Sequence, residues 1–112
     1  MTMVTFATVR RLFLALPGVV EATSYGTPSF RVRGTFLARL REEGVLVVKV
    51  GPGDQEALTT LEPEVYFITP HYAGSNAVLV RLDAIEEAAL GRLLTASWRL
   101  HAPRRVVAAH IP

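Results

Sequence analysis

The chain lacks cysteine, has a single lysine, and contains no long hydrophobic run in its 112 residues. Without cysteine there is no disulfide bond, no thiolate nucleophile and no cysteine-ligated zinc or iron–sulfur site. The apolar run before Pro17 is only five residues long, too short for a signal-peptide core or a membrane span. We interpret it as part of an amphipathic helix, and these absences together favour a cytoplasmic protein that does not enter the membrane.

The composition is typical of a folded domain. Half of the residues are hydrophobic and a fifth are charged, whereas disordered chains combine low hydrophobicity with high net charge. A chain of 112 residues is typical of one domain with one core, so we expect a single domain over residues 1–112. The net charge is only +2, although the sequence pI is about 9.5. Overall charge therefore gives weak support for an anionic partner.

Three helices are predicted from capping residues and from apolar residues spaced three and four apart. Thr5 is the expected N-cap of the first helix, and Asp54 is the expected N-cap of a short second helix over residues 55–62. The third helix is expected from about residue 83 to residue 101, with Trp98 in the core. The side of the second helix expected to be buried consists of Ala57, Leu58 and Leu61.

Short segments of alternating apolar and polar residues predict an antiparallel sheet. The candidate strands are Ser29–Val32, Phe36–Arg41, Val45–Val50, Val65–Ile68 and Ala77–Leu82, with Ala22–Tyr25 as an optional sixth. Apolar residues share one face only if the first three of these are joined by three-residue loops, with Gly44 in a left-handed conformation. The expected pairs are Val32 with Phe36, Phe36 with Val50, Ala38 with Val48, and Leu40 with Leu46. Helices that do not alternate regularly with strands then predict an α+β fold of two layers, with helices on one face of the sheet.

The second face of this predicted sheet carries most of the basic residues of the strands. The residues on this face or at its rim are Arg31, Arg33, Arg39, Arg41, Lys49 and Arg81. Acidic residues are expected in turns and helices instead, which would polarise the domain. Arginine offers paired donors to phosphate, so nucleic acid is one expected partner. A protein contact and an ordinary solvated face are the alternatives, and the former is favoured by apolar residues expected on the same side, Leu37, Val45, Val47 and Leu79.

Catalysis has little support in the sequence. His71, His101 and His110 are far apart, and no spacing links them to a serine or a carboxylate. We therefore expect neither an enzyme nor a cofactor, and no metal site. His71 and Tyr72 lie in a loop rich in proline and glycine and form the one polar focus. A small-molecule site is a further hypothesis, with the lining Tyr25, Ser29, His71 and Tyr72.

Seven segments spread along the chain carry a family resemblance. They are LPGV (Leu16–Val19), EATSYGTPSFRV (Glu21–Val32), FLARL (Phe36–Leu40), VVKV (Val47–Val50), TPHY (Thr69–Tyr72), VLVRL (Val78–Leu82) and ASWRLHAPRRVVAA (Ala96–Ala109). Together they resemble the MmcQ/YjbR family of small bacterial proteins. This resemblance implies a two-layer fold of the secretion-chaperone type, with helices packed on an antiparallel sheet. Members are commonly labelled DNA-binding, and the resemblance brings no catalytic residues to this chain.

The leading hypothesis is a non-enzymatic module that binds double-stranded DNA with low sequence specificity through the basic face. Exposed aromatic rings would favour a single strand, but Phe30 and Phe36 are expected to point inward. The second hypothesis is a homodimer or another protein contact through the same face, as in a chaperone-like domain. The small-molecule site is the third.

Overall fold

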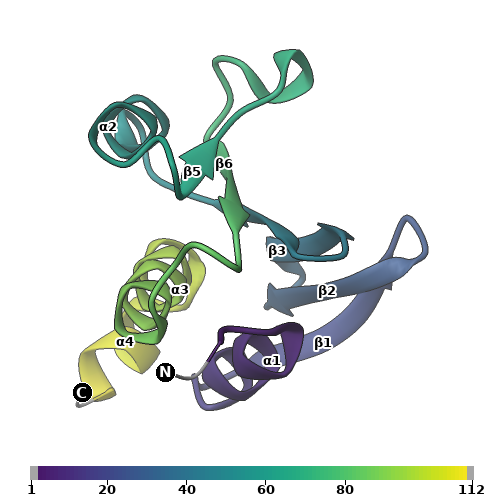
Figure 1. Ribbon diagram of the computed structural model, residues 1–112. Coiled ribbons are helices and arrows are strands. Elements are labelled where there is room, and N and C mark those ends of the chain that lie inside the picture. The colour runs from purple at the N-terminus through teal and green to yellow at the C-terminus, as the bar shows by residue number, and fades with distance from the viewer. Residues whose placement is uncertain (1–2, 111–112) are drawn as a thin grey trace.

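The computed structural model describes residues 3–110. Its helices are α1 (Phe6–Leu14), α2 (Asp54–Leu61), α3 (Glu87–His101) and α4 (Arg104–Ala109), with a short 3-10 helix η1 (Pro70–Tyr72). Its strands are β1 (Val19–Ser24), β2 (Thr27–Val32), β3 (Thr35–Glu42), β4 (Val45–Lys49), β5 (Tyr66–Phe67) and β6 (Ala77–Arg81). Within the described residues the strands form one antiparallel sheet in the order β1-β2-β3-β4-β6-β5 (Figure 1). The predicted α+β fold is confirmed.

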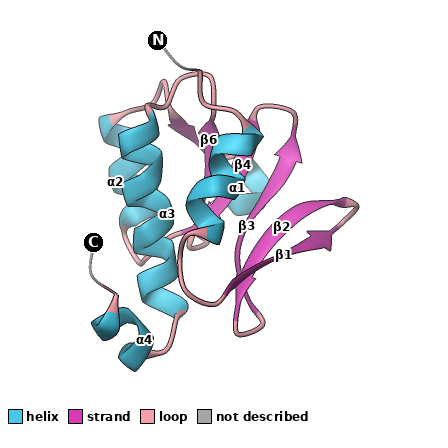
Figure 2. Cartoon of the chain, turned by 90° about the horizontal axis from the view of Figure 1, so that it is seen from below, coloured by secondary structure: helices cyan, strands magenta, loops and turns pink. Residues whose placement is uncertain are grey.

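The hydrophobic core lies between one face of the sheet and helices α1 and α3, which pack side by side (Figure 2). Phe13 of α1 stacks on Phe30 of β2, with 4.7 Å between the ring centroids. Trp98 of α3 is fully buried, and its Nε1 donates a hydrogen bond to the carbonyl oxygen of Pro17 (2.8 Å). This bond ties α3 to the loop after α1, and the predicted place of Trp98 in the core is confirmed.

The ends of α1 and α3 follow the capping and proline signals of the sequence only in part. Thr5 precedes α1 as predicted, and its backbone N–H donates to Thr8 Oγ1 (3.2 Å). Helix α3 ends at His101, before Pro103, but begins at Glu87 because residues 82–84 form a turn. Helix α4 was not predicted. No helix of residues 3–110 is long and apolar enough to cross a membrane.

Helix α2 differs from its prediction at both its cap and its buried side. Gly53, with φ 84°, is the N-cap, and Asp54 is the first helical residue. The Asp54 Oδ2 accepts a hydrogen bond from the backbone N–H of Gly51 (3.0 Å). Leu61 is 76% exposed and Ala57 is exposed, so these two positions of the expected buried side are wrong. The helix lies beside β5 and β6, near one end of the sheet, rather than over its centre.

The β2–β3 hairpin has a different register from the predicted one. Val32 pairs with Thr35, and Arg31 pairs with Phe36. The connection is therefore a two-residue turn at 33–34, in which both residues have positive φ (50° and 77°), as in the type I′ turns that suit the twist of hairpins. The predicted pair of Val32 with Phe36 is wrong.

A β-bulge on β3 explains how the apolar residues still reach the core. Phe30 pairs with Ala38 whereas Arg31 pairs with Phe36, so Leu37 is an extra residue on β3. Leu37 lies in the core and is fully buried, with 0% of its surface exposed. Phe36 lies on the other face with Arg31. Both positions are the reverse of the prediction, in which Phe36 pointed inward and Leu37 outward.

The β3–β4 hairpin is closer to its prediction. Two expected pairs are confirmed, namely Ala38 with Val48 and Leu40 with Leu46. Gly44 has the predicted left-handed conformation, with φ 80°. The expected pair of Phe36 with Val50 is absent, because the bulge displaces Phe36 and β4 ends at Lys49. Glu42, expected in the turn, is the last residue of β3 and pairs with Val45, so the loop has two residues and the predicted three-residue loop is wrong. An irregularity in the register between Leu40 and Glu42 accommodates the shorter loop.

Candidate functional site

The sheet face opposite to α1 and α3 is called the open face below. It carries both basic and apolar side chains. Arg39 pairs with Val47, and Val47 pairs with Leu79. Lys49 lies two residues from Val47 on β4, and Arg81 lies two residues from Leu79 on β6. Since side chains alternate along a strand, all of them share one face. The predicted face of Arg39, Lys49 and Arg81 is therefore confirmed.

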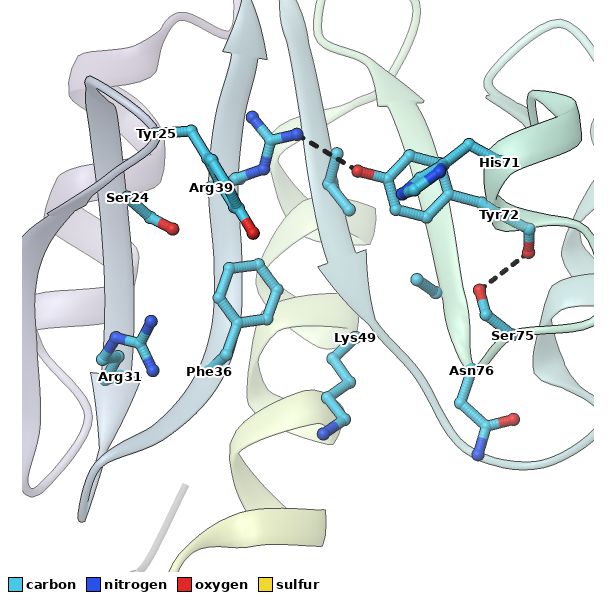
Figure 3. A pocket seen from close by; sticks show the side chains of 12 residues that line it. Ser24, Tyr25, Arg31, Phe36, Arg39, Lys49, His71, Tyr72, Ser75 and Asn76 are labelled. Carbon is cyan, nitrogen blue, oxygen red and sulfur yellow. Dashed lines mark hydrogen bonds between the residues drawn. The ribbon is translucent and has the colours of Figure 1, made fainter.

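A pocket of about 780 Å³ is present on the open face, between the β1–β2 turn and η1 (Figure 3). Its basic lining residues are Arg31, Arg39 and Lys49. Its aromatic lining residues are Tyr25, Phe36, His71 and Tyr72, and the remainder are Ser24, Val47, Ser75, Asn76 and Ala77. No aspartate or glutamate belongs to this lining. The fold thus brings residues of two separate hypotheses, the basic face and the small-molecule site, around one pocket.

Arg39 connects the two walls of the pocket. Its Nη2 donates a hydrogen bond to the Tyr72 Oη (3.2 Å), and its guanidinium carbon lies 5.4 Å from the centroid of the Tyr25 ring. The first contact is to η1 and the second is to the β1–β2 turn. The His71 ring lies edge-on to the Tyr72 ring, with 4.8 Å between their centroids. These contacts hold a cation between the Tyr25 ring and the Tyr72 hydroxyl, which come from opposite walls of the pocket on the same face of the sheet (Figure 3).

Gln55 of α2 fixes the loop that carries His71 and Tyr72. Its Nε2 donates hydrogen bonds to the carbonyl oxygens of Tyr72 (2.8 Å) and Ala77 (2.7 Å), and its Oε1 accepts one from the Gly74 N–H (3.1 Å). Sequence reasoning missed this residue, because a glutamine on a short helix carries no motif. The place of Phe36 in the pocket was missed as well. Alternation of apolar and polar residues assumes a regular strand and does not reveal the bulge at Leu37.

Tyr25 occupies an unusual position at the tip of the β1–β2 turn. It has φ 52° and is followed by Gly26 with φ 78°. Positive φ is uncommon for residues other than glycine, and it is unfavourable by about 1–2 kcal/mol. Tyr25 is also 91% exposed as a residue, so core packing does not explain why a large aromatic residue stands there.

Three of the predicted basic residues lie outside the pocket. Arg33 is exposed in the β2–β3 turn, and Arg41 forms an ion pair with Glu42. Arg81 lies over the Phe67 ring, 4.1 Å from its centroid, toward the β5 edge of the same face. The predicted cluster therefore divides into three pocket residues and three peripheral ones.

The open face is less apolar at its surface than expected. Val47 and Leu79 lie on it as predicted, but they are almost fully buried, and Leu37 belongs to the core.

The structure does not place Ser29 at the pocket, where the small-molecule hypothesis expected it. Ser29 is fully buried, does not line the pocket, and its Oγ has no hydrogen-bond partner among the described atoms. Likewise, no group of three or more His, Asp or Glu side chains within residues 3–110 is placed to hold a metal ion.

Comparison with known proteins adds the family. The YjbR family model matches residues 14–100 of this chain. The chain belongs to the YjbR family. The resemblance found in the sequence is thus confirmed, and every residue that lines the pocket lies within the matched range.

The similar proteins carry no functional assignment. The uncharacterized proteins Rv2570 of Mycobacterium tuberculosis and Mb2600 of Mycobacterium bovis are 48% identical over 59 residues, which cover 53% of this chain. The match spans about half the length of these relatives (46%). The crystal structure of Deinococcus radiodurans protein DR2400, with a DUF419 domain, superposes with a TM-score of 0.75 at 26% identity, covering 88% of this chain and 78% of that one. It confirms the α+β fold.

Proposed function

We propose that this protein binds DNA with low sequence specificity through the open face, and that it acts by binding without catalysing a reaction. The observation that carries the proposal is the convergence of Arg31, Arg39 and Lys49 on one pocket that has no acidic lining residue. Among the described residues, none of these three cations forms an ion pair with a carboxylate. Their charges are therefore available to an external anion.

Phosphate groups are the anions that this arrangement suits. Arginine presents planar, paired donors that match phosphate oxygens, and lysine acts as a compact point charge. Arg81 extends the basic character of the open face beyond the pocket, toward β5. Contacts to phosphate carry no sequence information, which is why the expected specificity is low.

The salt dependence of binding tests the proposal. We expect a fluorescein-labelled 12-nucleotide DNA to bind, with an affinity that falls about 20-fold for a single strand, or 40-fold for a duplex, between 50 and 200 mM salt. This magnitude follows from three phosphates neutralised by three cations. Fluorescence anisotropy measures it directly.

A double variant and a matched control make the test specific. Arg39→Gln with Lys49→Gln removes two of the three pocket cations, so the slope of log affinity against log salt should fall to about a third. Arg99→Gln removes an exposed arginine from α3, which packs on the other face, and should leave the slope unchanged. Binding that ignores ionic strength, or equal slopes in the double variant and the wild type, would refute the proposal.

A small anionic molecule is the second candidate, and the shape of the site favours it. A pocket of about 780 Å³ lies within the range of small-molecule sites, about 300–1,000 Å³. Calorimetric titration with thymidine monophosphate separates the two candidates. If the mononucleotide binds as tightly as the 12-nucleotide strand, then the pocket alone supplies the affinity and the small-molecule function is supported.

A further inference from the structure

The two walls of the pocket restrict which form of DNA can enter it. One wall is the β1–β2 turn with Tyr25, and the other is η1 with His71 and Tyr72 (Figure 3). In a duplex the faces of the bases are covered by stacking, and only phosphates and groove edges are presented to a protein. An unpaired base, in contrast, is a flat group that fits between side chains in a pocket of this size.

Aromatic side chains are available to stack on such a base. Tyr25 is 91% exposed at the tip of its turn, where its backbone has positive φ. The positive φ belongs to the two-residue turn at 25–26, which has the same geometry as the turn at 33–34. Because the core does not use this exposed ring, it is available to a ligand in the pocket. The bulge on β3 adds Phe36, which is half-buried and lines the same pocket. From the sequence, Phe36 was expected to point into the core, which argued against a single strand. The structure places Phe36 on the open face, so that argument no longer holds.

Cations and rings alternate within the pocket. The Arg31 guanidinium carbon lies 5.8 Å from the centroid of the Phe36 ring, and Arg39 lies over Tyr25 and bonds to Tyr72. Planar guanidinium groups held on aromatic faces offer both a stacking surface and phosphate donors. Proteins that bind single strands combine the same two elements, a basic groove and aromatic platforms. The pocket thus has donors for a phosphate and a surface for the base attached to it.

We infer that the pocket holds one unstacked base of a single DNA strand, with the adjoining phosphate on Arg31 or Lys49, so that single-stranded DNA binds more tightly than duplex DNA. This inference rests on the proposed DNA-binding function. The sequence alone favoured double-stranded DNA as the ligand, whereas this inference favours a single strand. It also assigns Tyr25 as the residue that stacks on the base.

The experiment compares dT12 with a mixed-sequence 12-base-pair duplex, at 50 and 200 mM salt, by fluorescence anisotropy. Tyr25→Ala removes the ring, and Tyr25→Phe is the matched control that keeps the ring and the same backbone strain. Because Tyr25 is 91% exposed as a residue, neither change should alter the thermal stability appreciably. Base stacking on one aromatic ring corresponds to about a 5- to 150-fold change in affinity.

The expected result is that dT12 binds at least about fivefold more tightly than the duplex, that Tyr25→Ala abolishes this ratio, and that Tyr25→Phe keeps it. If the duplex binds as tightly as dT12, or if Tyr25→Ala leaves the ratio unchanged, the inference is overturned. Salt-dependent binding in that case would leave the proposed function standing. If neither oligonucleotide shows salt-dependent binding, the proposed function is overturned as well.

Discussion

The bulge on β3 can be tested by comparing alanine substitutions at two adjacent residues, Phe36 and Leu37. In the structure Leu37 is fully buried in the core, and Phe36 is half-buried beside the pocket on the open face. A regular strand without the bulge would reverse these positions. The order of the two destabilisations therefore reports which residue faces the core.

The magnitudes follow from burial. Leu37→Ala removes a fully buried side chain and leaves a cavity, which should lower the free energy of unfolding by about 2–5 kcal/mol. Phe36→Ala opens no closed cavity and loses most, but not all, of the 1.5–3 kcal/mol that full burial contributes, or about 1–2.5 kcal/mol. Val20, exposed and opposite Arg31 on β1, serves as a control, and Val20→Ala should change stability by less than about 0.5 kcal/mol.

Urea unfolding measures these differences, with the fluorescence of Trp98, the one tryptophan of the chain and fully buried, as the probe. With a slope of about 1.5 kcal/mol per molar urea, the midpoint should fall by about 1.3–3.3 M for Leu37→Ala and by about 0.7–1.7 M for Phe36→Ala. A larger fall for Phe36→Ala than for Leu37→Ala would show that the bulge is absent. Unequal slopes would invalidate the comparison, so equal slopes are part of the expected result.

Two further predictions concern an ion pair and the support of the pocket. Arg10 donates two hydrogen bonds to the Glu21 carboxylate (2.7 and 2.9 Å), and these lower the pKa of Glu21 below its ordinary 4.5. Because the pKa of Glu21 is lower in the folded state than in the unfolded state, the pair stabilises the protein above about pH 4.5 and stabilises it less as the pH falls below that value. The difference in melting temperature between the wild type and Glu21→Gln, measured by circular dichroism, should therefore shrink as the pH is lowered. A difference that does not depend on pH would contradict this expectation. Gln55→Ala removes the hydrogen bonds that hold the η1 loop and should weaken dT12 binding about fivefold, the equivalent of one lost hydrogen bond. Anisotropy measures this loss, and an unchanged affinity would show that the loop needs no such support.

Much of the fold follows from local pattern in the sequence. The start of α1 after Thr5, the place of Trp98 in the core and two of the β3–β4 pairs were predictable, because each depends on periodicity and on residues close in the chain. The β2–β3 register was not, since the alternation rule assumes a regular strand and the chain contains a bulge at Leu37. The turn at 33–34 added to the error, because arginine is a rare residue at a positive φ.

The sequence allowed the basic residues of the candidate site to be predicted, but not the pocket that they line. Alternation was enough to place Arg39 and Lys49 on one face, and the loop with His71 stood out by its composition. Their convergence on Tyr25 depends on how η1 folds back over the sheet, which is a long-range arrangement without a local signal. Gln55 belongs to the same class, because its partners are backbone groups more than fifteen residues away.

The position of α2 has a consequence for the order of the site. None of the residues Asp54–Leu61 or Pro70–Tyr72 is fully buried, so α2 and η1 are joined to the domain with little apolar burial, whereas Val65 and Tyr66 between them belong to the core. Elements of this kind open at a lower free energy than the core does, and we expect α2 and η1 to open while Val65 and Tyr66 stay packed in the core. One wall of the pocket can then detach while the sheet and α1 stay folded. A ligand that needs both walls selects the closed state and stabilises it, so occupancy of the pocket and folding of these elements are thermodynamically linked.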